Sequence, residues 1–85
     1  MRKFLFTTTA QVQFNGWEKA DKKIYNKIID LLQATQTSPF NGIGKPEPLK
    51  HQLKGCWSRR INKEHRLVYQ VTPEAIIVIS CKFHY

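Results

Sequence analysis

The sequence has few of the features that mark exported, membrane-spanning or metal-binding proteins. None of its 85 residues lies in an apolar run that approaches the roughly 18 residues of a membrane span. The start of the chain, residues 1–6, is too short and too soon polar for a signal peptide. Cys56 and Cys81 are the only cysteines, and no ligand spacing typical of zinc joins them to the three histidines. We therefore expect a cytoplasmic protein with reduced thiols, no metal and no cofactor.

Acidic residues are also scarce. Six Asp and Glu stand against 14 Lys and Arg, which gives a formal net charge of +8. Such an excess attracts nucleic acid, an acidic membrane or an acidic protein. A hydrophobic content of 41% indicates a folded domain rather than a basic disordered tail. We expect one domain over residues 1–85, with a modest core that buries roughly 60–65% of the unfolded surface.

The first half of the chain predicts one strand and two helices. Residues 3–7 alternate in the manner of a strand. Thr8 or Thr9 would cap a helix that runs to about residue 20, although a glycine within it weakens the pattern. Asp21 is a good N-cap for a second helix, whose apolar residues recur at helical spacing until about Thr37.

The second half predicts a loop and three strands. Residues 38–48 hold three of the four prolines and two of the four glycines, a loop long enough to suspect a function. Period-two alternation then predicts strands at 57–61, 66–71 and 75–81. The order β-α-α-β-β-β indicates an α+β fold, an antiparallel twisted sheet with both helices packed on one face.

Alternation also assigns side chains to the two faces of this sheet. Leu67, Tyr69 and Val71 should point toward the helices. We place Arg66, Val68 and Gln70 on the other face, together with Trp57, Arg59 and Ile61. Residues 45–66 contain seven cations against two carboxylates, a net charge of +5. A sheet face with that charge and an aromatic side chain predicts an RNA-binding surface.

Four runs of residues resemble one known family. They are GKPEPLKH at 44–51, WSRRI at 57–61, EHRLVY at 64–69 and the terminal HY at 84–85. The chain is similar in these runs to the YoeB/Txe toxins of the RelE/ParE superfamily. The resemblance implies a RelE-like, microbial ribonuclease-type fold and a toxin of a type II toxin–antitoxin system.

The same resemblance implies an activity and partners. The toxin would cut messenger RNA in the ribosomal A site and inhibit translation. It would act without a metal, by attack of the ribose 2′-hydroxyl that leaves a 2′,3′-cyclic phosphate and a 5′-hydroxyl. Its antitoxin would be of the YefM/Phd type, and operator DNA would be bound only through the antitoxin complex. A homodimer is also expected from the family.

Site residues carried over by the resemblance make chemical sense. Glu47 would be the general base, His84 the general acid and Arg66 the phosphate clamp, whose planar fork suits a phosphate. Tyr85 would stack on a base, and the chain end must bend so that it and His84 serve one site. The RNA contacts would come from Lys50, His51, Lys54, Trp57 and Arg59.

Two other functions remain open from the sequence. A ParE-like toxin shares the fold but inhibits a DNA topoisomerase without cutting RNA. A general single-stranded nucleic-acid-binding protein would use the charge alone, with an affinity that falls steeply with salt. Neither needs Glu47 and His84 together.

Overall fold

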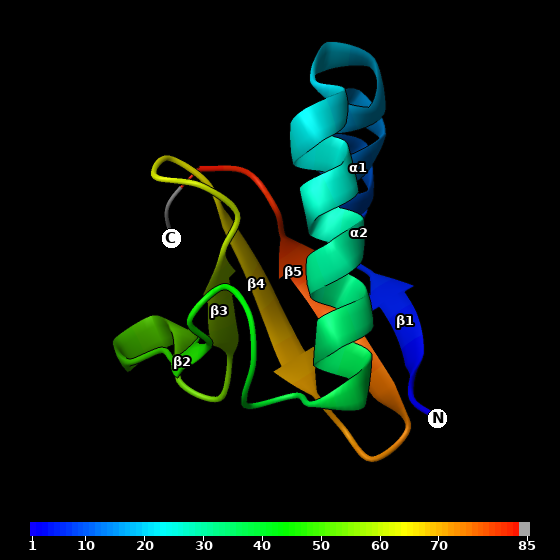
Figure 1. Ribbon diagram of the computed structural model, residues 1–85. Coiled ribbons are helices and arrows are strands. Elements are labelled where there is room, and N and C mark those ends of the chain that lie inside the picture. The colour runs from blue at the N-terminus through cyan, green and yellow to red at the C-terminus, as the bar shows by residue number, and fades with distance from the viewer. Residues whose placement is uncertain (84–85) are drawn as a thin grey trace.

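The computed structural model describes residues 1–83 as two helices lying against one sheet (Figure 1). Both predicted helices and the β-α-α-β-β-β order are confirmed, with an additional two-residue strand and a short 3-10 helix (η1) inside the segment before β3. The elements are β1 Lys3–Phe6, α1 Thr8–Ala20, α2 Lys22–Thr37, β2 Glu47–Pro48, η1 His51–Leu53, β3 Trp57–Arg60, β4 Arg66–Val71 and β5 Ala75–Ser80.

The sheet is mixed, so the prediction of an antiparallel sheet is wrong for its first strand. The strand order is β1-β5-β4-β3-β2, and the three pairs from β5 to β2 are antiparallel. β1 instead pairs with β5 in parallel, with Lys3 opposite Ala75. Side-chain alternation shows which residues share a face, but it carries no information on strand direction. That direction is set by the path of the chain through the two helices.

Local side chains fix where each helix begins. The cap of α1 is Thr7 and not the predicted Thr8 or Thr9, because the Thr7 hydroxyl accepts a hydrogen bond from the Ala10 amide at 3.1 Å. Asp21 caps α2 as predicted, because its carboxylate accepts hydrogen bonds from the Lys23 and Ile24 amides. Each such cap contributes about 1 kcal/mol. α1 and α2 lie side by side on one face of the sheet (Figure 1).

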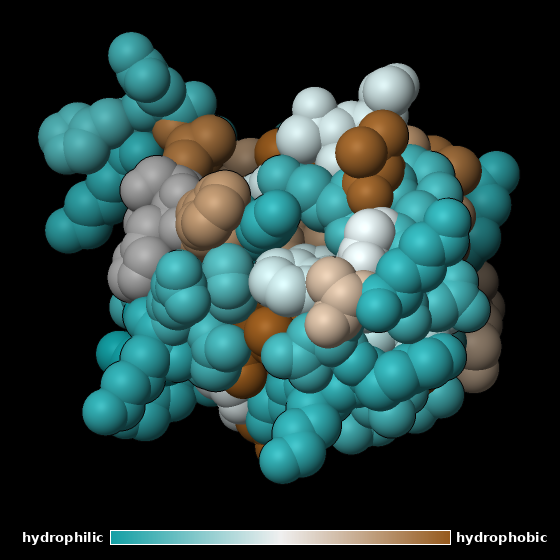
Figure 2. Space-filling view, turned by 90° about the horizontal axis from the view of Figure 1, so that it is seen from above, coloured by the Kyte–Doolittle hydropathy of each residue, from teal (hydrophilic) through white to brown (hydrophobic). Residues whose placement is uncertain are grey.

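The core lies between this helix pair and the sheet. Its fully buried members include Ile28 and Leu31 from α2, and Leu67, Tyr69 and Ile76 from the central strands. Burying a side chain such as leucine contributes roughly 1.5–3 kcal/mol, so this layer holds the sheet and helices together. Over residues 1–83, neither helix combines the length and apolar character that crossing a membrane requires. From above, most of the visible surface is hydrophilic (Figure 2).

Candidate nucleic-acid interface and active site

The sheet has a second face that the helices do not cover, which we call the helix-free face. Directly opposed residues share a face, and the register places Glu47 opposite Ser58 and Ser58 opposite Val68. Two residues after Ser58 along β3, Arg60 lies opposite Arg66. The helix-free face therefore includes Glu47, Ser58, Arg60, Arg66 and Val68.

Glu47 and Arg66 are close enough on this face to act on one group. They are separated by two strand spacings and one two-residue step. With about 4.8 Å per strand and about 6.7 Å per step, their Cα atoms are roughly 12 Å apart. Ser58 and Val68, which lie between them, are each 2% exposed, so the two side chains flank a covered part of the face. The sheet thus unites two of the three residues predicted for catalysis.

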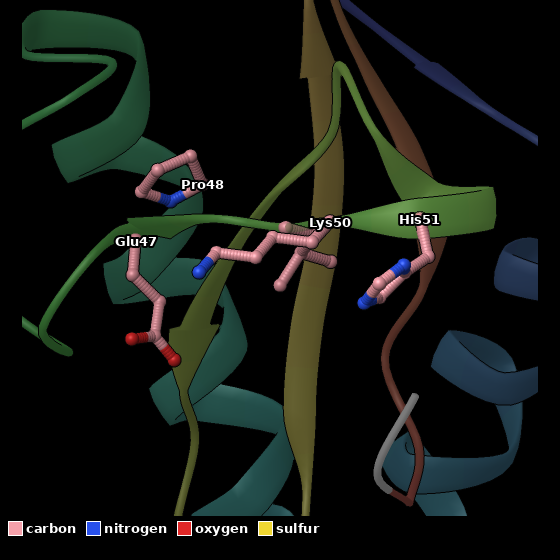
Figure 3. Close-up of a pocket in the computed structure, with 5 residues that line it drawn as sticks. Glu47, Pro48, Lys50 and His51 are labelled. Atoms are coloured by element: carbon pink, nitrogen blue, oxygen red, sulfur yellow. The ribbon is translucent and has the colours of Figure 1, made fainter.

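Glu47 lies at the edge of the sheet, in β2. It lines a shallow hollow of about 330 Å³ with Pro48, Leu49, Lys50 and His51. Glu47, Lys50 and His51 extend to one side of this segment, and Pro48 lies on the other (Figure 3). Leu49 is buried and anchors the segment beneath them. A carboxylate, an ammonium and an imidazole therefore surround one small surface that is open to a ligand.

Arg66 is oriented by the turn before β4. Its Nη1 atom donates to the carbonyls of Asn62 at 2.6 Å, Lys63 at 3.3 Å and His65 at 3.0 Å. Its Nε and Nη2 atoms make no hydrogen bond within residues 1–83. One edge of the guanidinium fork is thus held by the backbone, while the other edge can donate two hydrogen bonds to an oxyanion.

His84 and Tyr85 lie outside the described residues, so their predicted roles stay predictions. The chain reaches them from Phe83, whose φ of 62° turns the backbone away from the line of β5. The Phe83 carbonyl accepts a hydrogen bond from the Arg66 amide at 3.1 Å. The segment after β5 crosses to the turn between β3 and β4 (Figure 1). The chain thus bends at Phe83, beside Arg66, and the predicted arrangement of His84 and Tyr85 stays a prediction.

The predicted face of Trp57, Arg59 and Ile61 is wrong. The register pairs Trp57 with Tyr69 and Arg59 with Leu67, which places them on the helix side of the sheet. Ile61 belongs to the buried core, and Trp57 packs against that core. Side chains alternate within each strand as predicted, but the predicted alignment of β3 with β4 differs from the observed one by one residue. A shift of one residue exchanges the faces.

Arg59 is consequently an internal residue and not a phosphate contact. It is 0% exposed. Its guanidinium donates to the carbonyls of Ser38, Asn41 and Ile43 at 2.6, 2.8 and 2.9 Å. Its Nε donates to the Tyr69 hydroxyl at 3.1 Å. Arg59 thus fastens the loop before β2 onto the sheet.

Tyr69 completes this internal clamp. Its hydroxyl donates to the Pro39 carbonyl at 2.8 Å. Burial raises the pKa of the Tyr69 phenol, although the hydrogen bond from Arg59 opposes the rise. The phenol therefore stays protonated and remains a donor.

Sequence reasoning missed Arg60 as a site residue. Arg60 is exposed and lies directly opposite Arg66 on the helix-free face. The sequence contained the necessary information, because successive residues of a strand point to opposite faces. Arg59 and Arg60 therefore cannot lie on the same face. Lys50, His51 and Lys54 are exposed along the neighbouring segment, as contacts with RNA require.

The small basic α+β fold and its similarity to solved YoeB structures place the chain in the class of RelE-like toxins. Within that class, a family model for the YoeB-like toxin of bacterial type II toxin-antitoxin systems matches residues 6–85. The chain belongs to this family.

Relatives and solved structures agree with the assignment. Toxin YoeB of Escherichia coli (strain K12) is 54% identical over 69 residues, which are 81% of this chain and 82% of that relative. A YoeB dimer from Staphylococcus aureus has a TM-score of 0.93 at 44% identity and covers 99% of this chain and 98% of its own. A YoeB-YefM complex from the same organism has a TM-score of 0.92 at 42% identity, with coverages of 100% and 99%.

Proposed function

We propose that this toxin is a ribosome-dependent endoribonuclease that cuts messenger RNA in the ribosomal A site and so inhibits translation. One observation supports it most: Glu47 and Arg66 share the helix-free face, and the chain enters residue 84 beside Arg66. A protein that only binds RNA needs no carboxylate among its cations, since a negative charge weakens attraction to phosphate.

The proposed reaction uses three groups and no metal. Glu47 takes the proton of the ribose 2′-hydroxyl as its oxygen attacks the adjacent phosphorus. The bond from phosphorus to the 5′-oxygen breaks, and His84 gives that oxygen a proton. The products are a 2′,3′-cyclic phosphate and a 5′-hydroxyl. Arg66 stabilises the additional negative charge on the phosphorane through its Nε and Nη2 atoms, which make no hydrogen bond to the described part of the chain.

Contacts that position the RNA come from the surrounding cations. Lys50, His51 and Lys54 lie in the exposed segment after Glu47, and Arg60 extends the helix-free face. Tyr85 would stack on a base beside the cut. Trp57 is half-buried on the opposite face, against Phe40 at 4.8 Å between ring centroids, so we give it a packing role.

The partner is an antitoxin of the YefM type, as in the complex of the S. aureus relative. An acidic segment of the antitoxin would cover the basic helix-free face, since the chain carries a net charge of +8. Operator DNA would be bound through that complex, in the cytoplasm. The dimer of the S. aureus relative supports self-association of this chain as well.

The test supplies purified toxin to programmed ribosomes carrying end-labelled message. We expect fragments with a 2′,3′-cyclic phosphate and a 5′-hydroxyl, the ends that attack by the ribose 2′-hydroxyl leaves. Naked message should be cut far more slowly. His84→Gln should retain ribosome binding and lose cutting by about 10²–10⁴-fold, because it removes the acid and leaves the cationic face intact.

Two results would contradict the proposal. Intact message, combined with inhibition of a DNA topoisomerase, would favour the ParE-like alternative. Equal cutting of naked and ribosome-bound message would remove the ribosome from the mechanism.

A further inference from the structure

The segment between β5 and the chain end is held by side chains from distant parts of the fold. The Trp17 indole donates to the Cys81 carbonyl at 2.9 Å, and the Cys81 amide donates to the Gln13 side chain at 2.7 Å. Two residues later, the Phe83 amide donates to Nδ1 of His65 at 2.7 Å. Strand pairing with β4 has ended here, so these bonds replace the lost ladder.

His65 is built into this position. It is 4% exposed, and its ring lies 4.8 Å from the Trp17 ring and 5.4 Å from the Phe83 ring. The Asn62 side chain accepts a hydrogen bond from the His65 amide at 2.8 Å, which fixes the backbone of the turn. Backbone and ring are both held, so the imidazole has one orientation.

The hydrogen bond also defines the tautomer of His65. Nδ1 accepts the Phe83 amide, so it carries no proton, and the ring hydrogen lies on Nε2. Nε2 is 3.6 Å from a carboxylate oxygen of Glu64, a group that suits the Nε2–H tautomer. His65 is therefore an acceptor in the fold, a role that no alkyl or purely donating side chain can fill.

Phe83 shows why an acceptor is needed at this point. Its φ of 62° lies in the left-handed region, which costs a non-glycine residue free energy and persists only where neighbours hold it. Its amide is bound by His65 and its carbonyl by the Arg66 amide. These two bonds, one on each side of the strained residue, hold the bend next to the predicted phosphate clamp.

We propose that His65 is a positioning residue for the cleavage reaction: its Nδ1 atom fixes the bend at Phe83, the residue that directly precedes the proposed general acid His84. The inference rests on the proposed function, in which His84 is the general acid. His65 acts on the backbone before residue 84, and the catalytic group itself remains His84. Without the acceptor, Phe83 relaxes from the left-handed region and the chain leaves Arg66 in another direction.

Substituting His65 by asparagine or by glutamine distinguishes this role from simple packing. Asparagine carries its oxygen on Cγ, where histidine carries Nδ1, and so keeps the acceptor. Glutamine carries its polar atoms farther out, near the position of Nε2. Both substitutions remove the ring contacts with Trp17 and Phe83, so they are matched in what they lose from packing.

The test measures the rate of message cleavage over a range of programmed-ribosome concentrations, which gives kcat and KM, at a temperature where circular dichroism shows every variant folded. His65→Asn should stay within about threefold of the unsubstituted toxin, and His65→Gln should lower kcat by about 30-fold or more with KM unchanged. In a His84→Gln background, adding His65→Gln should lower the residual rate by less than about twofold, because the positioned group is already gone.

Three results would overturn the inference. They are equal losses for asparagine and glutamine, a change in KM alone, and a full additional loss in the His84→Gln background. If the unsubstituted toxin does not cut at all, the proposed function fails first, and that outcome is distinct from these three.

Discussion

Arg59 and Arg60 are identical side chains in adjacent positions, and the fold uses them in opposite ways. Arg59 is 0% exposed and donates to three loop carbonyls and one phenol. Arg60 is exposed on the helix-free face, opposite Arg66. Residue type and local charge density are the same, so neither can tell structural from functional arginine. The face of the strand decides, and cross-strand register decides the face.

The buried arginine nevertheless serves the exposed face. The loop that Arg59 holds leads through Gly44 into β2, and the Arg60 amide donates to the Gly44 carbonyl at 2.7 Å. Glu47 follows three residues later. The position of the predicted base therefore depends on a guanidinium that never meets RNA.

The largest effect should come from removing the buried guanidinium. Arg59→Met leaves the carbonyls of Ser38, Asn41 and Ile43 without their donor, at about 1–3 kcal/mol each before relaxation. We expect a total loss of about 3–5 kcal/mol in the free energy of unfolding, measured by urea denaturation. Arg60→Met is the matched control and should change stability by about 0.5 kcal/mol or less. Similar losses for both variants would erase the distinction between the two arginines.

A smaller loss of stability should follow when the loop is pushed off the sheet. Gly44 has a φ of 82°, and a Cβ there would lie 2.8 Å from a Leu31 methyl carbon and 3.1 Å from Cβ of Arg59. Gly44→Ala should cost about 2–3 kcal/mol, from backbone strain and overpacking together. Gly55→Ala is the control, because Gly55 has a φ of 97° but nothing within 4 Å of the added carbon. It should cost about 1 kcal/mol, and an equal cost at both sites would mean that the loop is not tightly seated.

The exposed arginine should affect RNA binding instead. In a Glu47→Gln background that prevents cutting, Arg60→Gln should weaken binding of a short single-stranded RNA by about three- to tenfold and reduce the salt slope by about one. Fluorescence anisotropy across a range of KCl concentrations measures both. Lys23→Gln removes one exposed cation from α2 and serves as the control. An equal loss for Lys23→Gln would show that only net charge matters.

Near neutral pH the smallest effect concerns the two cysteines, one buried and one half-buried. Burial raises the pKa of the Cys81 thiol to about 12, whereas Cys56 is half-buried. The folded state holds the Cys81 proton more tightly than the unfolded state, so this stabilisation is complete below the unfolded pKa of about 8.5–9 and is lost as the pH rises toward 12.

Two measurements test this pH dependence and the difference in burial between the two thiols. Urea unfolding should show stability falling between pH 8 and pH 10.5, with a shallower fall in Cys81→Ala. At pH 8, iodoacetamide should modify Cys56 in the folded protein much faster than Cys81. Equal labelling rates would mean that the helix-covered side opens readily to solvent.

Features set by neighbouring residues were predictable from the sequence. The Asp21 cap, the helical spacing of α2 and the alternation of β4 all depend on contacts within a few positions, and all are confirmed. The parallel pairing of β1 and the two-residue strand β2 depend on partners far along the chain. Local patterns contain no information on those partners.

The residues of the candidate site could be predicted from the sequence, but their arrangement could not. Glu47 and Arg66 could be named from the sequence, yet their common face follows from pairings among β2, β3 and β4. Arg59 was misplaced because the turn at 61–65 sets the register, and there Ile61 and Asn62 both donate to the His65 carbonyl. Nothing in strand alternation specifies how many residues such a turn uses.

The central claim is that the catalytic residues lie on the helix-free face. Glu47 and Glu18 are both exposed carboxylates, but Glu18 lies on α1, away from that face. The decisive measurement is the single-turnover rate of message cleavage on saturating programmed ribosomes for Glu47→Gln and Glu18→Gln. We predict a loss of about 10²-fold or more for Glu47→Gln and less than about twofold for Glu18→Gln. An unchanged rate for Glu47→Gln, or equal losses for the two variants, would contradict the account.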